Sequence, residues 1–157
     1  MLKNEGNRLT RVAVCSPRKE YALGKNDLAH NLGNLGNPED AINQHDSLKA
    51  ELKAFGCEVI DLNELDGHPN SVFTRDTSLM TPEGYIQLRL GIDTRLGEGN
   101  WMGETLANLG LPLAGQIIAP GSVEGGDVVL AGNVAFVGQS IRTNAEGIRQ
   151  LSAILEP

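Results

Sequence analysis

The sequence lacks several features that mark whole classes of proteins. It has two cysteines, too few for the disulfide framework of a small secreted domain. Its 13 lysines and arginines form no cluster and face 20 acidic residues, so we expect no nucleic-acid or membrane partner. No apolar run approaches the roughly 20 residues of a membrane span, and the N-terminus lacks the apolar core of a signal peptide. We therefore expect a reduced, cytoplasmic protein.

Aromatic residues are also scarce, at 4% of the chain, whereas glycine is abundant with 19 residues. A hydrophobic fraction of 40% is ordinary for a globular protein, and 157 residues suffice to bury a core. The glycines indicate many turns between short elements. We predict a single α/β domain over residues 1–157.

The first part of the chain alternates strand and helix signals. Residues 11–16 predict a buried strand, and the Asn–Gly-rich stretch 18–36 predicts a long loop, either a lid or binding loop or a mobile segment without function. An Asn–Pro pair at 37–38 predicts a helix start, Gly56 its end, and residues 57–62 the next strand. Four apolar residues and one histidine recur at helical spacing and predict one buried stripe: Ala41, His45, Leu48, Leu52 and Phe55.

Two further units follow a common plan. Residues 72–80 and 85–90 predict a hairpin, which is followed by a helix over 98–109 and a strand over 115–119. Residues 127–131 and 134–138 predict another hairpin.

A capping box at 143–146 opens the helix of this last unit. The modules therefore run over residues 9–62, 70–119 and 122–157, and their period of roughly 50 residues favours a radial array. Because the last module lacks its closing strand, we expect an open apolar face and hence a homo-oligomer or a complementing C-terminal chain.

Polar residues stand at the edges of these predicted strands. Glu124 and Asp127 flank a glycine pair at 125–126, where the backbone can turn sharply or approach a ligand closely. A carboxylate held on such a turn can clamp a cation. The alternative is a Gly–Gly hairpin or bulge with two solvated acids.

Asp76, Arg89 and Arg142 occupy comparable positions. Carboxylates suit the fork of a guanidinium group, and arginines suit a carboxylate by the same geometry. Together with Glu124 and Asp127 these residues predict a site for an arginine-like ligand. Taken singly, each arginine could instead form an ordinary ion pair.

Four motifs in order resemble a known family. They are residues 69–76, Arg89, residues 124–128, and residues 136–144 with Gly147. Together they resemble the N-terminal part of the dimethylarginine dimethylaminohydrolases, in the guanidino-group-modifying superfamily of amidinotransferases and arginine deiminases. The resemblance covers residues 9–155. It implies the pentein fold, an α/β propeller of five ββαβ modules, of which this chain would hold almost three.

The resemblance also implies residue roles. Asp76 and Glu124 match the family's guanidinium-binding acids, and Arg89 and Arg142 match its carboxylate-binding arginines. Asn70 stands where dimethylarginine hydrolases tend to have an acid, while the sequence at 73–76 is closer to arginine deiminases. The substrate therefore stays open among dimethylarginine, monomethylarginine, arginine and another guanidine.

The family converts methylated arginine to citrulline without a cofactor or metal, by attack of a cysteine thiolate with a histidine as acid and base. Neither catalytic side chain is present at a matching position. Cys15 and Cys57 are expected to be inert core thiols. His45 is expected in the core and His68 in a loop, and His30 is uninformative. A working enzyme with a rewired cysteine or histidine is the least favoured hypothesis.

The preferred interpretation is the substrate-binding portion of a dimethylarginine or arginine hydrolase-like enzyme, inactive alone. The chain would then be a fragment, a truncated gene product or half of a split enzyme. The alternative is a non-catalytic module that binds a guanidine or serves in oligomeric assembly.

Overall fold

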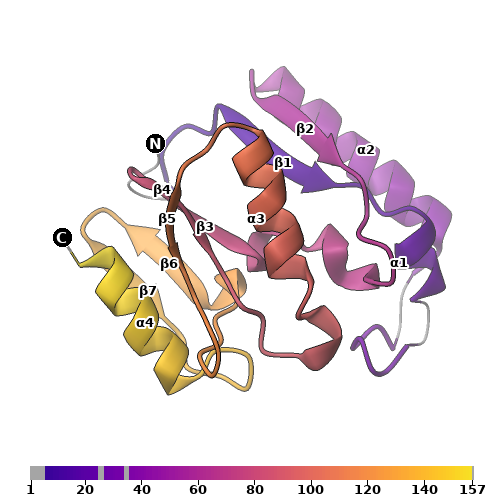
Figure 1. The fold of residues 1–157 in the computed structure, drawn as a ribbon. Helices are drawn as coiled ribbons and strands as arrows, with labels where there is room; N and C mark the ends of the chain where they lie inside the picture. Colours follow the sequence, from indigo (N-terminus) through magenta and orange to yellow (C-terminus); the bar gives the residue numbers. More distant parts are fainter. Residues whose placement is uncertain (1–5, 25–26, 34–35, 157) are drawn as a thin grey trace. The chain divides into compact units, whose positions relative to one another are not determined.

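A computed structural model describes residues 6–24, 27–33 and 36–156 (Figure 1). These residues divide into two compact units. One unit comprises residues 8–74, and the other comprises residues 75–156 together with residues 6–7.

The unit of residues 8–74 is built on two parallel strands. Strand β1 (Arg11–Cys15) pairs with β2 (Glu58–Leu62) in continuous register, and helix α2 (Pro38–Ala54) connects them. The predicted start of α2 is confirmed, since the Asn37 side chain accepts a hydrogen bond of 3.1 Å from the Glu39 backbone N–H. Gly56 follows the helix with φ of +84°, a conformation that favours glycine.

Two predictions for this unit were wrong. The stretch 18–36 is not all loop, because helix α1 (Lys19–Leu23) lies within it. Three backbone N–H groups at its start, those of Arg18, Glu20 and Tyr21, donate to the Glu64 carboxylate at 2.7, 2.9 and 3.0 Å. The capping group is therefore distant in sequence, which is why no local signal marked this helix.

The second error concerns the stripe on α2. No residue of this helix is buried, and Leu48 is 50% exposed. Phe55, just beyond the helix, is 75% exposed. The helix packs against a two-stranded sheet, which is too narrow to cover the apolar face of a 17-residue helix.

A polar cluster fastens α2 to the ends of β1 and β2. The Asp61 carboxylate accepts hydrogen bonds from the Ser16 hydroxyl and from Lys49 Nζ, each at 2.8 Å, and from Arg18 at 3.0 Å. His45 Nδ1 lies 3.2 Å from the same Ser16 hydroxyl. Burial raises the pKa of Asp61, but the hydrogen bonds from Lys49 and Ser16 outweigh it and bring the pKa down to about 2.

Asp61 is expected to make stability depend on acid pH. A carboxyl group with a depressed folded-state pKa stabilises the fold above its unfolded pKa, and this is lost as the pH falls from about 4 towards 2. The Asp61 side chain is 26% exposed, and the shift corresponds to about 2 kcal/mol. Asp61→Asn should lower the unfolding free energy by about this amount at pH 7. Between pH 4 and pH 2 the variant should then lose less stability than the wild type, because it lacks the carboxyl group that titrates there. Urea unfolding at several pH values measures both effects.

Glu58→Gln is the matched control, because Glu58 lies on the same strand and pairs with Arg11 in a mostly exposed ion pair. It should change stability by less than about 1 kcal/mol. Equal effects of Asp61→Asn and Glu58→Gln would refute the role given to Asp61.

The unit of residues 75–156 contains two sheets. Strands β3 (Ser78–Thr81) and β4 (Gly84–Gln87) form the predicted hairpin, and β5 (Leu113–Gln116) pairs parallel with β4. Helix α3 (Glu98–Asn108) packs against this sheet (Figure 1).

The second sheet is the hairpin of β6 (Val128–Ala131) and β7 (Val134–Val137), which is followed by helix α4 (Ala145–Leu155). One apolar core joins both sheets with α4. Its buried members are Leu79, Ile86, Leu88, Ile117, Val123, Val128 and Leu151.

Several predicted boundaries shift in this unit. The strand predicted over 72–80 begins only at Ser78, after a short 3₁₀ helix at Thr74–Asp76, and β5 begins and ends earlier than predicted. The cap of α4 is Asn144, which accepts from the Gly147 backbone N–H at 2.7 Å. Thr143 is not the cap, because its hydroxyl accepts from the Glu124 backbone N–H at 3.1 Å.

Among residues 6–24, 27–33 and 36–156, no helix combines the length and the apolar character that crossing a membrane requires.

Candidate functional site

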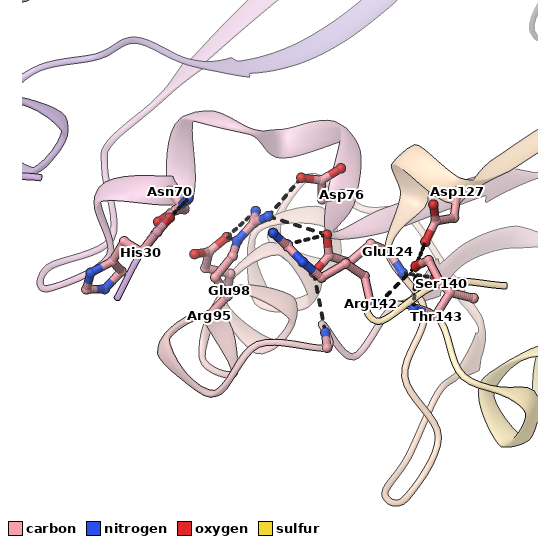
Figure 2. A network of polar contacts seen from close by, with 11 residues as sticks. His30, Asn70, Asp76, Arg95, Glu98, Glu124, Asp127, Ser140, Arg142 and Thr143 are labelled. Atoms are coloured by element: carbon pink, nitrogen blue, oxygen red, sulfur yellow. Dashed lines mark hydrogen bonds and ion pairs between the residues drawn. The ribbon is translucent and has the colours of Figure 1, made fainter. Parts of the chain in front are cut away.

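A buried arginine that the sequence analysis did not single out lies at the centre of the polar network. Arg95 ends the short 3₁₀ helix Asp93–Arg95, and its side chain is 3% exposed. Its Nε and Nη2 donate to Glu98 Oε2 at 3.0 and 2.7 Å, and its Nη1 donates to Asp76 Oδ2 at 2.8 Å. The same Nη1 lies 3.8 Å from Glu124 Oε2. Figure 2 shows these acids around the guanidinium group of Arg95.

Glycines allow the elements that carry these acids to approach closely. Glu98 belongs to the first turn of α3 and is fully buried, and a β-carbon on the next residue, Gly99, would lie 2.1 Å from the Leu88 carbonyl oxygen. Glu124 is followed by Gly125, where a β-carbon would lie 2.0 Å from the Arg75 carbonyl oxygen. The predicted close approach at Gly125 is therefore made by the chain's own backbone.

Arg142 reaches the same cluster from the loop before α4. Its Nη1 lies 3.1 and 3.0 Å from the two carboxylate oxygens of Glu124. The side chain of Arg142 is 27% exposed, whereas that of Glu124 is 8% exposed. The structure thus brings together three of the predicted residues, Asp76, Glu124 and Arg142.

Asp127 organises the loop that carries Arg142. The Ser140 hydroxyl donates to Asp127 Oδ2 at 2.7 Å, and the same hydroxyl oxygen accepts from the backbone N–H groups of Arg142 and Thr143 at 3.0 and 3.1 Å. Figure 2 shows this chain of contacts from Asp127 to Glu124. Asp127 thus contacts the loop, and the loop in turn presents Arg142 to Glu124.

Two other predicted residues make different contacts within their own units. Arg89 is half-buried and its Nη1 donates to the Gly121 carbonyl oxygen at 3.2 Å; the described residues include no ion pair for it. Asn70 belongs to the unit of residues 8–74, where its amide donates to the His30 carbonyl oxygen at 3.1 Å.

The electrostatics of the cluster favour positive charge. Burial raises the pKa of Glu98, and the hydrogen bonds from Arg95 oppose that shift. Burial also lowers the pKa of Arg95, but Glu98 and Asp76 outweigh it and leave that pKa raised. Three carboxyl groups here meet two guanidinium groups. Within the described residues, the acids of this cluster outnumber its arginines, so the cluster suits a further hydrogen-bond donor of positive charge.

The sequence holds a signal for Arg95, but it lies at a helix start and not at the edge of a predicted strand. Arg95 and Glu98 are three residues apart at a helix start, a spacing typical of an exposed ion pair. However, Gly99 and Gly103 lie on the face of α3 that meets the sheet, and a β-carbon at Gly103 would lie 2.1 Å from the Gln87 side chain. Small residues at this spacing indicate close helix–sheet packing, which buries the neighbouring Glu98.

Both cysteines are buried. Cys15 is fully buried, and burial raises the pKa of its thiol to about 11. Cys57 is 6% exposed. Among the residues that the structure describes, no three histidine, cysteine, aspartate or glutamate side chains gather as a metal site.

We expect Cys15 in the folded chain to remain unreactive towards a thiol reagent at pH 7.5, because almost none of it is thiolate and no solvent reaches it. Mass spectrometry after labelling, with and without urea, measures the reaction at each cysteine. Cys57→Ser isolates Cys15 as the single thiol. Rapid labelling of Cys15 without denaturant would revive the hypothesis of a rewired nucleophile.

The chain is similar in sequence to a family of known proteins. A family model described as arginine deiminase matches residues 64–156. The N(G),N(G)-dimethylarginine dimethylaminohydrolase of Pseudomonas aeruginosa is 37% identical over 124 residues, which are 78% of this chain and 49% of the relative. The protein of the same name from Streptomyces coelicolor is 34% identical over 117 residues, which are 74% of this chain and 45% of the relative. The chain thus spans about half the length of these curated relatives.

Solved structures agree with these matches. The Pseudomonas aeruginosa dimethylarginine dimethylaminohydrolase, as a mutant complexed with citrulline, is 31% identical with a TM-score of 0.81, covering 95% of this chain and 57% of that one. The N-terminal domain of ArgZ, a cyanobacterial arginine dihydrolase bound to product, is 20% identical with a TM-score of 0.80, covering 94% of this chain and 55% of that one. The second likeness concerns the fold alone. The predicted α/β fold of pentein type is confirmed.

Proposed function

The chain belongs to the arginine deiminase family, and we propose that it forms the guanidino-ligand-binding portion of a dimethylarginine or arginine hydrolase-like protein. The observation that carries this proposal is the excess of acid around Arg95. Among the described residues, Asp76, Glu98 and Glu124 gather around the guanidinium groups of Arg95 and Arg142, so a guanidinium group supplied by a ligand would find carboxylate acceptors already fixed in place.

The ligand class follows from this geometry. Carboxylates match the planar fork of a guanidinium group with two parallel hydrogen bonds, which an ammonium group cannot form. The relatives named dimethylarginine dimethylaminohydrolase and the relative complexed with citrulline support a methylated arginine or arginine as the ligand. Arg142 is proposed to bind the ligand carboxylate. The same role stays proposed for Arg89, and Asn70 and Asp127 remain proposed members of the site.

The chemistry is proposed to come from residues outside this sequence. Cys15 is buried with a raised thiol pKa, which suits a structural role better than attack on a guanidine. In the proposed reaction a methylated arginine becomes citrulline, without a cofactor. We place the protein in the cytoplasm.

A partner is proposed to complete the fold. Strand β4 is flanked by β3 and β5, whereas β7 pairs only with β6 among the described residues. The free edge of β7 therefore suits a strand equivalent to β5, from a complementing C-terminal chain or a second copy.

A second candidate function is a non-catalytic module for guanidine binding or oligomeric assembly. The observation that favours it is that Arg95 and Arg142 themselves pair with the acids of the cluster. Under this alternative the chain would gain no activity from a complementing partner.

Citrulline formation tests the proposal. The purified chain is incubated with dimethylarginine, and separately with arginine, at neutral pH, alone and after co-expression with a chain that carries the remaining two modules. We expect citrulline only from the co-expressed pair. Turnover by the chain alone would contradict the proposal that the catalytic residues lie outside this sequence. If a stable co-expressed complex forms no citrulline, the non-catalytic module would be favoured.

A further inference from the structure

The two arginines of the cluster are held differently. Arg95 is 3% exposed and is fixed by hydrogen bonds to Glu98 and Asp76. Arg142 is 27% exposed, and its described side-chain hydrogen bonds all go to Glu124. Displacing Arg95 would leave buried carboxylates without its guanidinium group, whereas displacing Arg142 would separate one partly exposed side chain from one acid.

The pairing of Arg142 with Glu124 is not the strongest that the two groups can form. A single nitrogen, Nη1, contacts both carboxylate oxygens, at 3.1 and 3.0 Å. The stronger arrangement uses two nitrogens for two oxygens in parallel. An incoming guanidinium group can therefore compete for Glu124 by forming the two-nitrogen pair.

The backbone of Arg142 is held in place by its neighbours, so only its side chain has to move when a ligand takes its place on Glu124. The Ser140 hydroxyl oxygen accepts a hydrogen bond from the Arg142 backbone N–H, and the same hydroxyl donates to Asp127. A β-carbon on Gly91 would lie 2.4 Å from the Arg142 carbonyl oxygen, so the backbone is also packed from this side. A displaced Arg142 would therefore keep its guanidinium group close to Glu124.

We infer that Arg142 selects ligands by occupying the guanidinium position itself, so that a guanidine binds well only if it also offers Arg142 a carboxylate. The inference rests on the proposed function, because it takes Glu124 as an acceptor for the ligand guanidinium. An arginine-type ligand exchanges partners with the protein: its guanidinium replaces Arg142 on Glu124, and its carboxylate receives Arg142. A guanidine without a carboxylate also has to displace Arg142, but it offers Arg142 no new partner.

The test compares two ligands on one variant. L-Arginine and agmatine, the amine left when arginine loses its carboxylate, are titrated calorimetrically into the chain and into Arg142→Ala. We expect the wild-type chain to prefer arginine. Arg142→Ala should weaken arginine by about 10- to 100-fold, the worth of a hydrogen bond to a charged group. Agmatine should bind the variant several-fold tighter than the wild type, because its competitor for Glu124 is gone.

Arg149→Ala is the matched control, since Arg149 is 69% exposed and pairs with Glu146 on the surface of α4. It should leave both affinities unchanged. Because both ligands meet the same Arg142→Ala sample, a loss of folded protein would lower both together, and urea unfolding of the variant measures that loss directly. Weakened or unchanged agmatine binding in folded Arg142→Ala would overturn the inference while the proposed function stands. Absence of any guanidine binding by the wild type would overturn both.

Discussion

Replacement of Arg95 by alanine is expected to lower the unfolding free energy by about 3–5 kcal/mol, the usual cost of removing one partner from a buried ion pair. The change leaves the fully buried Glu98 and the partly buried Asp76 without the guanidinium group of Arg95, while Glu124 keeps Arg142. Burial already raises the pKa of Glu98, and loss of Arg95 should raise it further. Urea unfolding at pH 7 measures the loss of stability.

Two comparisons make this result specific. Arg149→Ala also removes one arginine from an arginine–glutamate pair three residues apart, but on an exposed helix face, and should have a far smaller effect. The Arg95 variant should also regain stability at lower pH, where Glu98 can take up a proton. A loss at Arg95 as small as that at Arg149 would refute the central place given to Arg95.

Replacement of Glu124 by glutamine is expected to weaken binding of dimethylarginine by roughly 1.5–3 kcal/mol, a 10- to 100-fold change in Kd. Glutamine keeps the shape of the side chain but loses its charge and turns one acceptor into a donor. The ligand guanidinium would then face an N–H group where it requires an oxygen. Calorimetric titration of both proteins with dimethylarginine measures the difference.

Glu146→Gln serves as the control for this titration. Glu146 is likewise paired with an arginine, but on the surface of α4. Its replacement should leave dimethylarginine binding unchanged. An unchanged affinity in Glu124→Gln would remove Glu124 from the site, and with it the proposed ligand geometry.

The fold could be predicted where the determining groups are close in sequence. Asn37 caps α2 through the second residue after it, and both hairpins turn within a few residues. Helix α1 could not be predicted, because its capping carboxylate, Glu64, comes from more than forty residues along the chain. Helix propensity and periodicity carry no information about such a partner.

The candidate site was predicted in part for the same reason. Asp76, Glu124 and Arg142 were found from their positions beside strands and glycines, and the structure brings them together. Arg95 was not, because an Arg–Glu pair at a helix start indicates an exposed ion pair unless the helix is known to pack closely against a sheet. Arg89 occupies the strand-edge position that suggested a ligand contact, yet its guanidinium group contacts a carbonyl of its own chain.

The central claim is that the acid cluster of this chain binds a guanidinium group. Its most direct test is calorimetric titration of the purified chain with dimethylarginine and, in parallel, with norleucine, which shares the amino and carboxylate groups but has no guanidine. We expect saturable binding of dimethylarginine and none of norleucine. Equal binding of the two, or binding of neither, would contradict it.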